Sequence, residues 1–294
     1  MRIKNALVYT VEHGFVERDV RIKNGCFAGS EAAGTDGEEI LDAGGDYLIP
    51  GLVDIHFHGC AGHDFSDGTP EALQAIGAYE LRQGVTSICP ASMTLSEETL
   101  KTVCANAYAY TKRPEAEQDT GARLIGIHLE GPFISMEKKG AQNPAYIRNP
   151  DVEMFLRLQE AAHGLVRLIT IAPETDGAKE FIRRLADQGP CVMIGRCADY
   201  ILAGRPDVVR VFVHADKDFC LEQAMKVDSL PENEVAKKIA EIDEYRARYY
   251  KHHTGHDWYD ARNYDLSLNS GVLGFDGTVE EIIKYMEVRE QFQK

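Results

Sequence analysis

The sequence lacks an excess of basic residues, long apolar runs and a leader-like start. Its 294 residues include 32 Lys and Arg against 47 Asp and Glu, which gives a formal net charge of −15. This charge argues against general affinity for nucleic acid or anionic membranes, because both bind basic surfaces. No apolar run reaches the roughly 18 residues of a membrane-spanning helix, and the residues after Met1 alternate instead of forming an apolar core, so we expect no signal peptide.

Paired cysteines are also missing. The seven cysteines are odd in number and never spaced C-x-x-C; they stand at positions 26, 60, 89, 104, 191, 197 and 220. This pattern excludes a disulfide framework and a zinc knuckle, and it is typical of thiols in a reducing compartment. We therefore predict a cytoplasmic protein.

Two kinds of patterning follow one another in the first 188 residues. Short strands separated by Gly, Asn and Asp are predicted within residues 1–50, which indicates a small β layer. From residue 51, strand-like runs alternate with helices; the runs are 85–90, 124–129 and 165–172, and the helices are 71–83, 96–112 and 152–162. Continuous apolar runs between helices favour parallel β/α units with both sheet faces covered. Such units often form a barrel whose active site lies at the carboxyl ends of the strands.

The sequence pattern changes near residue 188. Strands are expected at 191–194, 208–215 and 264–269, and a long polar helix is expected at 231–250. The predicted organisation is therefore a β-sandwich layer at 1–50, a partial (β/α) barrel at 51–188 and a second partial α/β segment at 189–294. The fold class is α/β throughout.

A histidine pair marks the first strand of the barrel-like part. His56 and His58 are two apart on a predicted strand that ends at Gly59, so both side chains point to the same face. Two imidazoles that converge at a strand end are what a zinc-type ion needs. The alternative is that both are surface histidines or histidines satisfied within the core.

A carboxylate stands at the end of a later strand. Glu130 follows His128 by two residues and precedes Gly131 and Pro132. In a regular strand His128 and Glu130 share a face, and a glutamate at a strand tip is a poor choice for packing but a good metal ligand. The alternative is a solvated turn glutamate beside a core histidine.

Residues 1 to about 188 resemble the N-terminal half of the N-acetylglucosamine-6-phosphate deacetylases of the amidohydrolase superfamily. The matching segments are residues 49–59, 83–87, 126–133, 138–144 and 170–174. The resemblance implies a β/α barrel with a β-sandwich and hydrolysis of the N-acetyl amide of an amino-sugar phosphate. It also implies a divalent metal, most often zinc, with Glu130 as a ligand and His56 and His58 as ligands of a second metal position. Gln142 lies where the family has a substrate-contacting loop residue.

The implied chemistry is metal-assisted hydrolysis, in which the ion polarises the amide carbonyl and activates water while a carboxylate moves the proton to the leaving amine. The family also uses two histidines and an aspartate from later strands. The corresponding Gly-His-(Ser/Thr) and His-Leu-Phe-Asn segments do not occur in residues 175–294. No catalytic residue is therefore assigned, and we expect weak activity or none.

Residues from about 189 to 290 resemble a different family, the cytidylate kinase-like proteins. The matching segments include residues 189–200, 210–215, 243–250 and 264–270. The resemblance implies that Arg196 faces a nucleotide and that Arg246 and Arg248 lie on a lid over its phosphates; a solvated helix face is the alternative for the last two. No G-x-x-x-x-G-K-[ST] phosphate loop occurs in the chain, so phosphoryl transfer from ATP is not expected.

The chain thus resembles the front of one enzyme joined to the back of another near residues 185–190. Three hypotheses follow: a deacetylase-like hydrolase, a nucleotide-binding segment without its phosphate loop, and a non-catalytic fusion. Half a barrel leaves open strand edges, which favour aggregation or dimerisation, so a homo-oligomer is also expected.

Overall fold

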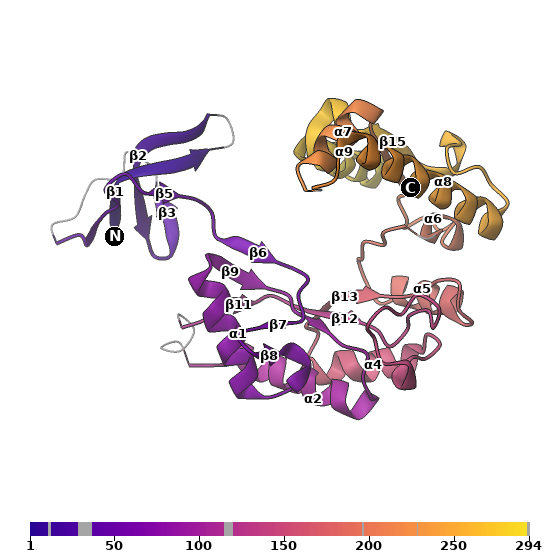
Figure 1. Cartoon of the computed structure of the whole chain (residues 1–294), viewed down its shortest axis with the longest axis horizontal. Helices are drawn as coiled ribbons and strands as arrows, with labels where there is room; N and C mark the ends of the chain where they lie inside the picture. Colours follow the sequence, from indigo (N-terminus) through magenta and orange to yellow (C-terminus); the bar gives the residue numbers. More distant parts are fainter. Residues whose placement is uncertain (11–12, 29–36, 115–119, 196, 228, 293–294) are drawn as a thin grey trace. The chain divides into compact units, whose positions relative to one another are not determined.

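The computed structural model describes residues 1–10, 13–28, 37–114, 120–195, 197–227 and 229–292, and the fold is mixed α/β (Figure 1). The chain forms two compact units. Unit 1 comprises Met1–Gly131 and Leu156–Thr170, and unit 2 comprises Pro132–Phe155 and Ile171–Lys294. Among the described residues, no helix combines the length and the apolar composition needed to cross a bilayer.

The predicted N-terminal β layer is present as one mixed five-stranded sheet. Its strands are β1 (Arg2–Thr10), β2 (Gly14–Lys23), β3 (Cys26–Ala28), β4 (Ile40–Asp42) and β5 (Tyr47–Leu48). They are ordered β3-β2-β1-β4, and β5 also pairs with β1. Ile3, Ala6 and Val20 form its buried core. The chain turns between β4 and β5, because Gly44 and Gly45 adopt positive φ angles of 57° and 94°.

Four further strand segments of unit 1 run parallel to one another. They are β6 (Leu52–Asp54), β9 with β10 (Val85–Ile88 and Ala91–Ser92), β11 with β12 (Arg123–Leu124 and Ile127–Glu130) and β13 (Val166–Thr170). Two sheets are formed, ordered β11-β9-β6 and β10-β12-β13. Further hydrogen bonds extend the pairing, because Ala91 N donates to Phe57 O at 2.8 Å and His128 N donates to Pro90 O at 2.9 Å. The four segments therefore lie side by side in chain order, as the alternation predicts.

Helices and short turns connect these strands, and the helices bury the apolar faces of the strands. The connecting elements are β7 (Gly59–Cys60), β8 (His63–Asp64), η1 (Phe65–Asp67), α1 (Pro70–Arg82), α2 (Glu97–Thr111) and α4 (Val152–Ala161). Thr69 and Ser96 cap α1 and α2 by accepting hydrogen bonds from the backbone three residues on. Figure 1 shows α1 and α2 alongside the strands, where α1 packs on β9 and α2 on β11. Ile76 and Leu100 are fully buried on the inner faces of the two helices.

Unit 2 is richer in helix than in sheet. Its elements are η2 (Pro144–Tyr146), α5 (Ala178–Ala186), α6 (Ala198–Ile201), β14 (Val211–His214), α7 (Lys217–Met225), α8 (Glu232–Thr254), η3 (Ala261–Asn263), β15 (Leu266–Asn269) and α9 (Ser270–Phe292). The strands β14 and β15 pair in parallel as a two-stranded sheet. Phe133 and Phe155 pack edge-on against Phe181 of α5, with ring centroids 5.1 and 5.9 Å away.

The prediction of a strand at residues 191–194 is wrong. These residues have no regular secondary structure, and Val192 and Ile194 are 89% and 93% exposed. A short apolar segment becomes a strand only when a neighbouring strand accepts its hydrogen bonds and covers its side chains. In the described part of unit 2, no strand pairs with this segment. Met193 packs partly against Ile182, Ile201 and Leu202, but Val192 and Ile194 are left uncovered.

Candidate metal centre

The histidine pair does not lie on a strand, contrary to the prediction. The strand β6 ends at Asp54, and His56 and His58 follow in an extended, irregular segment. The carboxylate of Asp54 turns the chain here, because its Oδ1 accepts a hydrogen bond from His56 N at 3.0 Å. Phe65 N donates to His58 O at 2.7 Å, which holds the far end of the segment. The backbone is therefore fixed on both sides of the pair, and between the two histidines Phe57 O accepts the hydrogen bond from Ala91 N.

Glu130 lies on a regular strand, as predicted. Along β12, Ile127 and Leu129 are buried, while His128 and Glu130 are half-buried on the opposite face. The residue after the glutamate must be glycine. Gly131 has a φ of +100°, and a Cβ atom there would overlap the side chain of Thr94.

The structure brings His56, His58 and Glu130 together. One ligand atom from each lies within 4.8 Å of the other two. His58 Nε2 and Glu130 Oε2 lie 2.9 Å apart. The other ring nitrogen of His58, Nδ1, lies 3.0 Å from the carbonyl oxygen of Ala91, which can only accept a hydrogen bond. In the neutral ring the proton is therefore on Nδ1, and Nε2 turns its lone pair toward the carboxylate.

This arrangement fits a divalent cation. A lone pair and a carboxylate oxygen at this distance repel each other unless a proton or a cation lies between or beside them. Two ligands of one tetrahedral zinc ion, each about 2.0 Å from the metal, are about 3.3 Å apart, close to the observed separation. Two imidazoles and one carboxylate also form the ligand set of many catalytic zinc sites. The donor set therefore supports a metal centre.

Two further side chains complete the surroundings of the cluster. His128 Nδ1 lies 3.1 Å from His56 Nδ1, and His128 Nε2 lies 2.9 Å from Thr170 Oγ1. Burial, followed by the neighbouring His56 ring, lowers the pKa of His128. The sequence pattern placed His128 on the face of Glu130 but gave no contact with His56, and it missed Thr170. One sequence signal could have identified Thr170, because it ends its predicted strand as Glu130 does. In the structure the two residues are paired in register.

The predicted substrate-contacting residue, Gln142, lies in unit 2. It is buried in the loop before η2, where its backbone N–H donates to Lys139 O at 3.1 Å. Its role in substrate contact stays a prediction. The predicted nucleotide-facing residue Arg196 lies outside the described residues.

The two predicted lid arginines lie on α8 and are exposed. Arg246 Nη1 contacts Asp243 Oδ1 at 3.1 Å, and Arg248 Nη1 contacts Glu244 Oε1 at 3.8 Å. Residues two apart on an α-helix are rotated by about 200°, so these guanidinium groups point to different sides of α8. Their arrangement is that of ion pairs within one solvated helix, and a phosphate-binding role stays a prediction.

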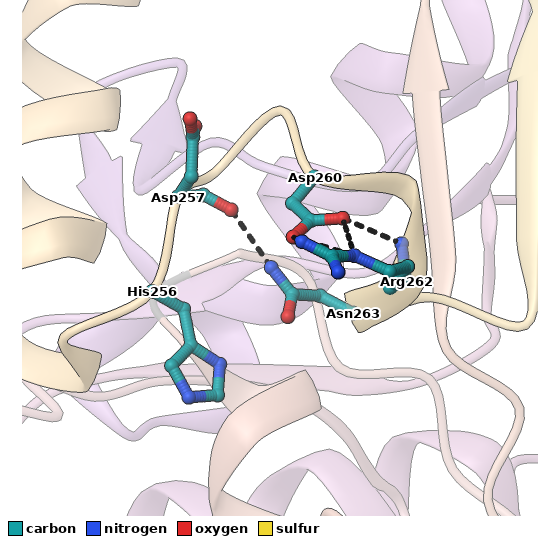
Figure 2. A pocket seen from close by; sticks show the side chains of 5 residues that line it. All are labelled: His256, Asp257, Asp260, Arg262 and Asn263. Atoms are coloured by element: carbon teal, nitrogen blue, oxygen red, sulfur yellow. Dashed lines mark hydrogen bonds and ion pairs between the residues drawn. The ribbon is translucent and has the colours of Figure 1, made fainter.

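A separate open pocket of about 350 Å³ lies in the loop between α8 and β15, lined by His256, Asp257, Asp260, Arg262 and Asn263 (Figure 2). Figure 2 shows the guanidinium of Arg262 folded onto the carboxylate of Asp260, with Nη2 and Oδ2 at 2.6 Å. Asn263 Nδ2 donates to the backbone oxygen of Asp257 at 2.7 Å. The ion pair takes up the charges of Arg262 and Asp260 within the loop, and no residue predicted for either function lines the pocket.

Comparison with known proteins supports both resemblances. The cytidylate kinase-like family matches residues 170–272. The N-acetylglucosamine-6-phosphate deacetylase of Bacillus subtilis (strain 168) is 37% identical over 158 residues, which are 54% of this chain and 40% of that protein. The chain therefore spans about half the length, or less, of the curated relatives that it matches.

Solved structures give the same result for the fold. The crystal structure of N-acetyl-D-glucosamine-6-phosphate deacetylase from Mycobacterium smegmatis is similar with a TM-score of 0.56 and 28% identity, over 73% of this chain and 55% of that one. A variant of that enzyme in complex with N-acetyl-D-glucosamine-6-phosphate is similar with a TM-score of 0.55 and 26% identity, over the same 73% and 55%. The deacetylase-like part of this chain thus has amidohydrolase neighbours in structure as well as in sequence.

Proposed function

We propose that this chain is a partial deacetylase-type hydrolase that binds a divalent metal, zinc by preference, at His56, His58 and Glu130. Its substrate class is an N-acetylated amino-sugar phosphate, and its turnover is weak or absent. The observation that carries this proposal is the convergence of two imidazoles and one carboxylate within 4.8 Å. The relatives support the substrate class, since one of them was solved with N-acetyl-D-glucosamine-6-phosphate.

The four β/α units are interpreted as a partial (β/α) barrel of amidohydrolase type. The three ligands then lie at or just beyond the carboxyl ends of strands, where barrels of this kind have their active sites. When bound, the ion supplies polarisation of the amide carbonyl and acidification of water. The chain itself orients the ligands, because the Ala91 carbonyl holds the His58 ring and the Asp54 carboxylate holds the backbone of His56.

Weak turnover is proposed because the later parts of a deacetylase site have no counterpart in the sequence. Residues 175–294 contain four histidines, at 214, 252, 253 and 256. None of them lies in a Gly-His-(Ser/Thr) or His-Leu-Phe-Asn segment. A metal held by three protein ligands remains feasible, but no residue is available in a recognised position to serve as the general acid and base.

Metal analysis of the purified protein tests the binding site. We expect zinc to bind to the wild-type chain and binding to fall at least tenfold in the double variant His56→Ala/His58→Ala and in Glu130→Gln. His163→Ala is the matched control, because His163 stacks on Tyr108 outside the cluster. Equal zinc content in the wild type and the double variant would remove the ligand assignment.

An activity assay tests the second half of the proposal. Amine release from N-acetylglucosamine 6-phosphate, measured with added zinc, should be slow or undetectable. Robust turnover that is lost in Glu130→Ala would show that the site is complete and that the proposed weakness is wrong.

The match of residues 170–272 to the cytidylate kinase-like family favours a second candidate function, nucleotide binding in unit 2. Arg196 is proposed to face the nucleotide, and Arg246 and Arg248 are the proposed phosphate contacts. Calorimetric titration with CMP and with ATP tests it, and we expect binding of CMP only. Tight ATP binding would mean that another segment replaces the missing phosphate loop. If neither CMP nor ATP binds, nucleotide binding by unit 2 is ruled out.

A further inference from the structure

The two outer edges of the four-strand arrangement in unit 1 are open. β6 is the first segment and β13 the last, and among the described residues no strand pairs with the outer side of either. Apolar side chains stand on both edges, and Val53 of β6 is 56% exposed while Leu168 of β13 is 37% exposed. Unpaired edges that carry apolar residues are templates for pairing with another chain.

The direction of the strands limits what can pair there. All four segments run parallel, so a layer that continues this arrangement from β13 round to β6 as a parallel barrel presents strands running the same way. A second copy of this chain meets the requirement when the two-fold axis lies along the strands, because that rotation keeps their direction. Each β6 then lies beside the β13 of the other copy. Eight parallel strands close into a barrel that has no edges.

Charge favours the same pairing. β6 carries Asp54, and β13 carries the exposed Arg167. A β6–β13 junction between copies brings an acidic and a basic residue to the same interface, twice per dimer. Pairing β6 with β6 would instead bring two aspartates together, and like charges on adjacent strands are destabilising.

We propose that the chain forms a two-fold dimer in which the four-strand arrangements of two copies complete one eight-stranded barrel. The partner also contributes to the metal centre. Thr170 ends β13 in register with Glu130, so a strand added to β13 continues beside Thr170. In the dimer that strand is β6 of the partner, and the partner's His56 and the partner's His58 follow it. This inference does not depend on the proposed hydrolase activity, since a dimer can form without turnover.

Mass measurement in solution tests the dimer with the full chain. The wild type should have twice the chain mass of 32.7 kDa by light scattering and by native mass spectrometry. The double variant Val53→Lys/Leu168→Lys should be monomeric, because it brings two lysines together at each junction. The variant Val53→Glu/Leu168→Lys should remain dimeric, because each junction then pairs a glutamate with a lysine. Phe27→Lys, at an 82% exposed site in the N-terminal sheet, is the control and should remain dimeric.

Several outcomes would overturn the proposal. A monomeric wild type at micromolar concentration would mean that no second copy covers the edges, and larger open assemblies would mean that the pairing does not close. Dimers in both double variants would place the interface elsewhere. Monomers in both, with far-UV circular dichroism like that of the wild type, would show that β6 does not face β13.

Discussion

The deacetylase-like residues up to about 188 and the kinase-like residues after them differ in how well they bury their own apolar side chains. Ile76, Leu100 and Leu129 are among the largest fully buried side chains of the first region, and Val235 is the one comparable residue described in the second. Large apolar side chains are exposed in both regions, such as Phe27 on β3 in the first and Phe275 on α9 in the second. In the first region, helices pack on several adjacent strands. The second region has a two-stranded sheet, and the stability of such a sheet is marginal by itself.

This difference explains what the kinase-like motif residues do in the structure. Many of them hold neighbouring elements together. Tyr250 OH donates to Asp199 Oδ2 at 2.6 Å, and Phe212 stacks on Tyr264 with ring centroids 5.0 Å apart. Burial and the neighbouring Asp199 carboxylate raise the pKa of Tyr250, so this hydroxyl stays protonated as a donor. These motif residues therefore pack neighbouring elements of the second region together.

Matched leucine truncations should give the largest contrast between the two regions. Leu100 of α2 is fully buried, whereas Leu273 of α9 is exposed. Leu100→Ala should lower the free energy of unfolding by about 2–5 kcal/mol, because it removes buried methyl groups and leaves a cavity. Leu273→Ala should cost less than about 1 kcal/mol. Urea titration followed by far-UV circular dichroism measures both, and equal costs would mean that the second region has a well-packed core after all.

Metal binding should stabilise one region only. Zinc at 100 times its dissociation constant adds about 2.7 kcal/mol to the stability of the unit that binds it. The ligands lie in unit 1, and the single tryptophan, Trp258, lies in unit 2. Zinc should therefore raise the melting temperature seen by far-UV circular dichroism and leave the melting curve seen by Trp258 fluorescence unchanged.

The control for this measurement is Glu130→Gln, which should abolish the zinc-dependent shift. An equal shift in both signals would show that the two units unfold as one. The two regions would then have no separate stabilities to compare.

Local patterns were sufficient for the elements of the first region. The β layer, the β/α alternation and the shared face of His128 and Glu130 could all be predicted, because periodicity and caps such as Ser96 determine them within a few residues. The residue at which β6 ends could not be predicted from these patterns. It depends on the hydrogen bond from His56 N to the side chain of Asp54, a local competitor to strand pairing that leaves no mark in the apolar pattern.

Contacts between residues distant in the sequence were harder to predict, both in the candidate site and in the second region. The contact of His56 with His128 joins residues 72 positions apart, and no spacing rule predicts it. The failed strand at residues 191–194 has the same cause, since a short apolar run is typical of a strand but the neighbour that a strand requires must come from elsewhere. Sequence patterns thus predict what an element is capable of forming, and tertiary contacts decide whether it forms.

An ion pair in unit 2 should have a moderate effect. Arg210 Nη2 lies 2.9 Å from Asp265 Oδ1, and Arg210 N donates to Asp265 Oδ2 at 2.8 Å, which joins the starts of β14 and β15. The Arg210 guanidinium lowers the pKa of Asp265. A carboxyl group with a lowered pKa in the folded state stabilises the protein above its unfolded pKa, and this contribution is lost as the pH falls through the folded value.

Asp265→Asn should therefore lower the stability of unit 2 by about 1–2 kcal/mol at neutral pH and flatten its pH dependence below about pH 4. Trp258 fluorescence during urea unfolding measures this. An unchanged acid profile in the variant would mean that the pair does not hold the two strands together.

The smallest effect is expected from the corresponding ion pair of the first region. Arg157 Nε and Nη2 donate to the two carboxylate oxygens of Glu97 at 2.6 and 3.0 Å, and Lys101 Nζ lies 2.9 Å from the same carboxylate. The hydrogen bonds from Arg157 and then Lys101 lower the pKa of Glu97 to about 2. By the same linkage, the stabilisation is complete above the ordinary glutamate pKa and is lost as the pH falls toward about 2.

Glu97→Gln should cost at most about 1 kcal/mol at neutral pH, because exposed pairs are weakened by solvent and salt. Urea titration of unit 1, followed by far-UV circular dichroism, measures the cost, and 1 M salt should reduce it further. Lys237→Gln is the matched control, since Lys237 contacts Glu241 at 3.7 Å on an exposed face of α8 in unit 2 and should change stability by a few tenths of a kcal/mol at most. A Glu97→Gln cost as large as that of Leu100→Ala would contradict the view that apolar burial, more than ion pairing, distinguishes the first region from the second.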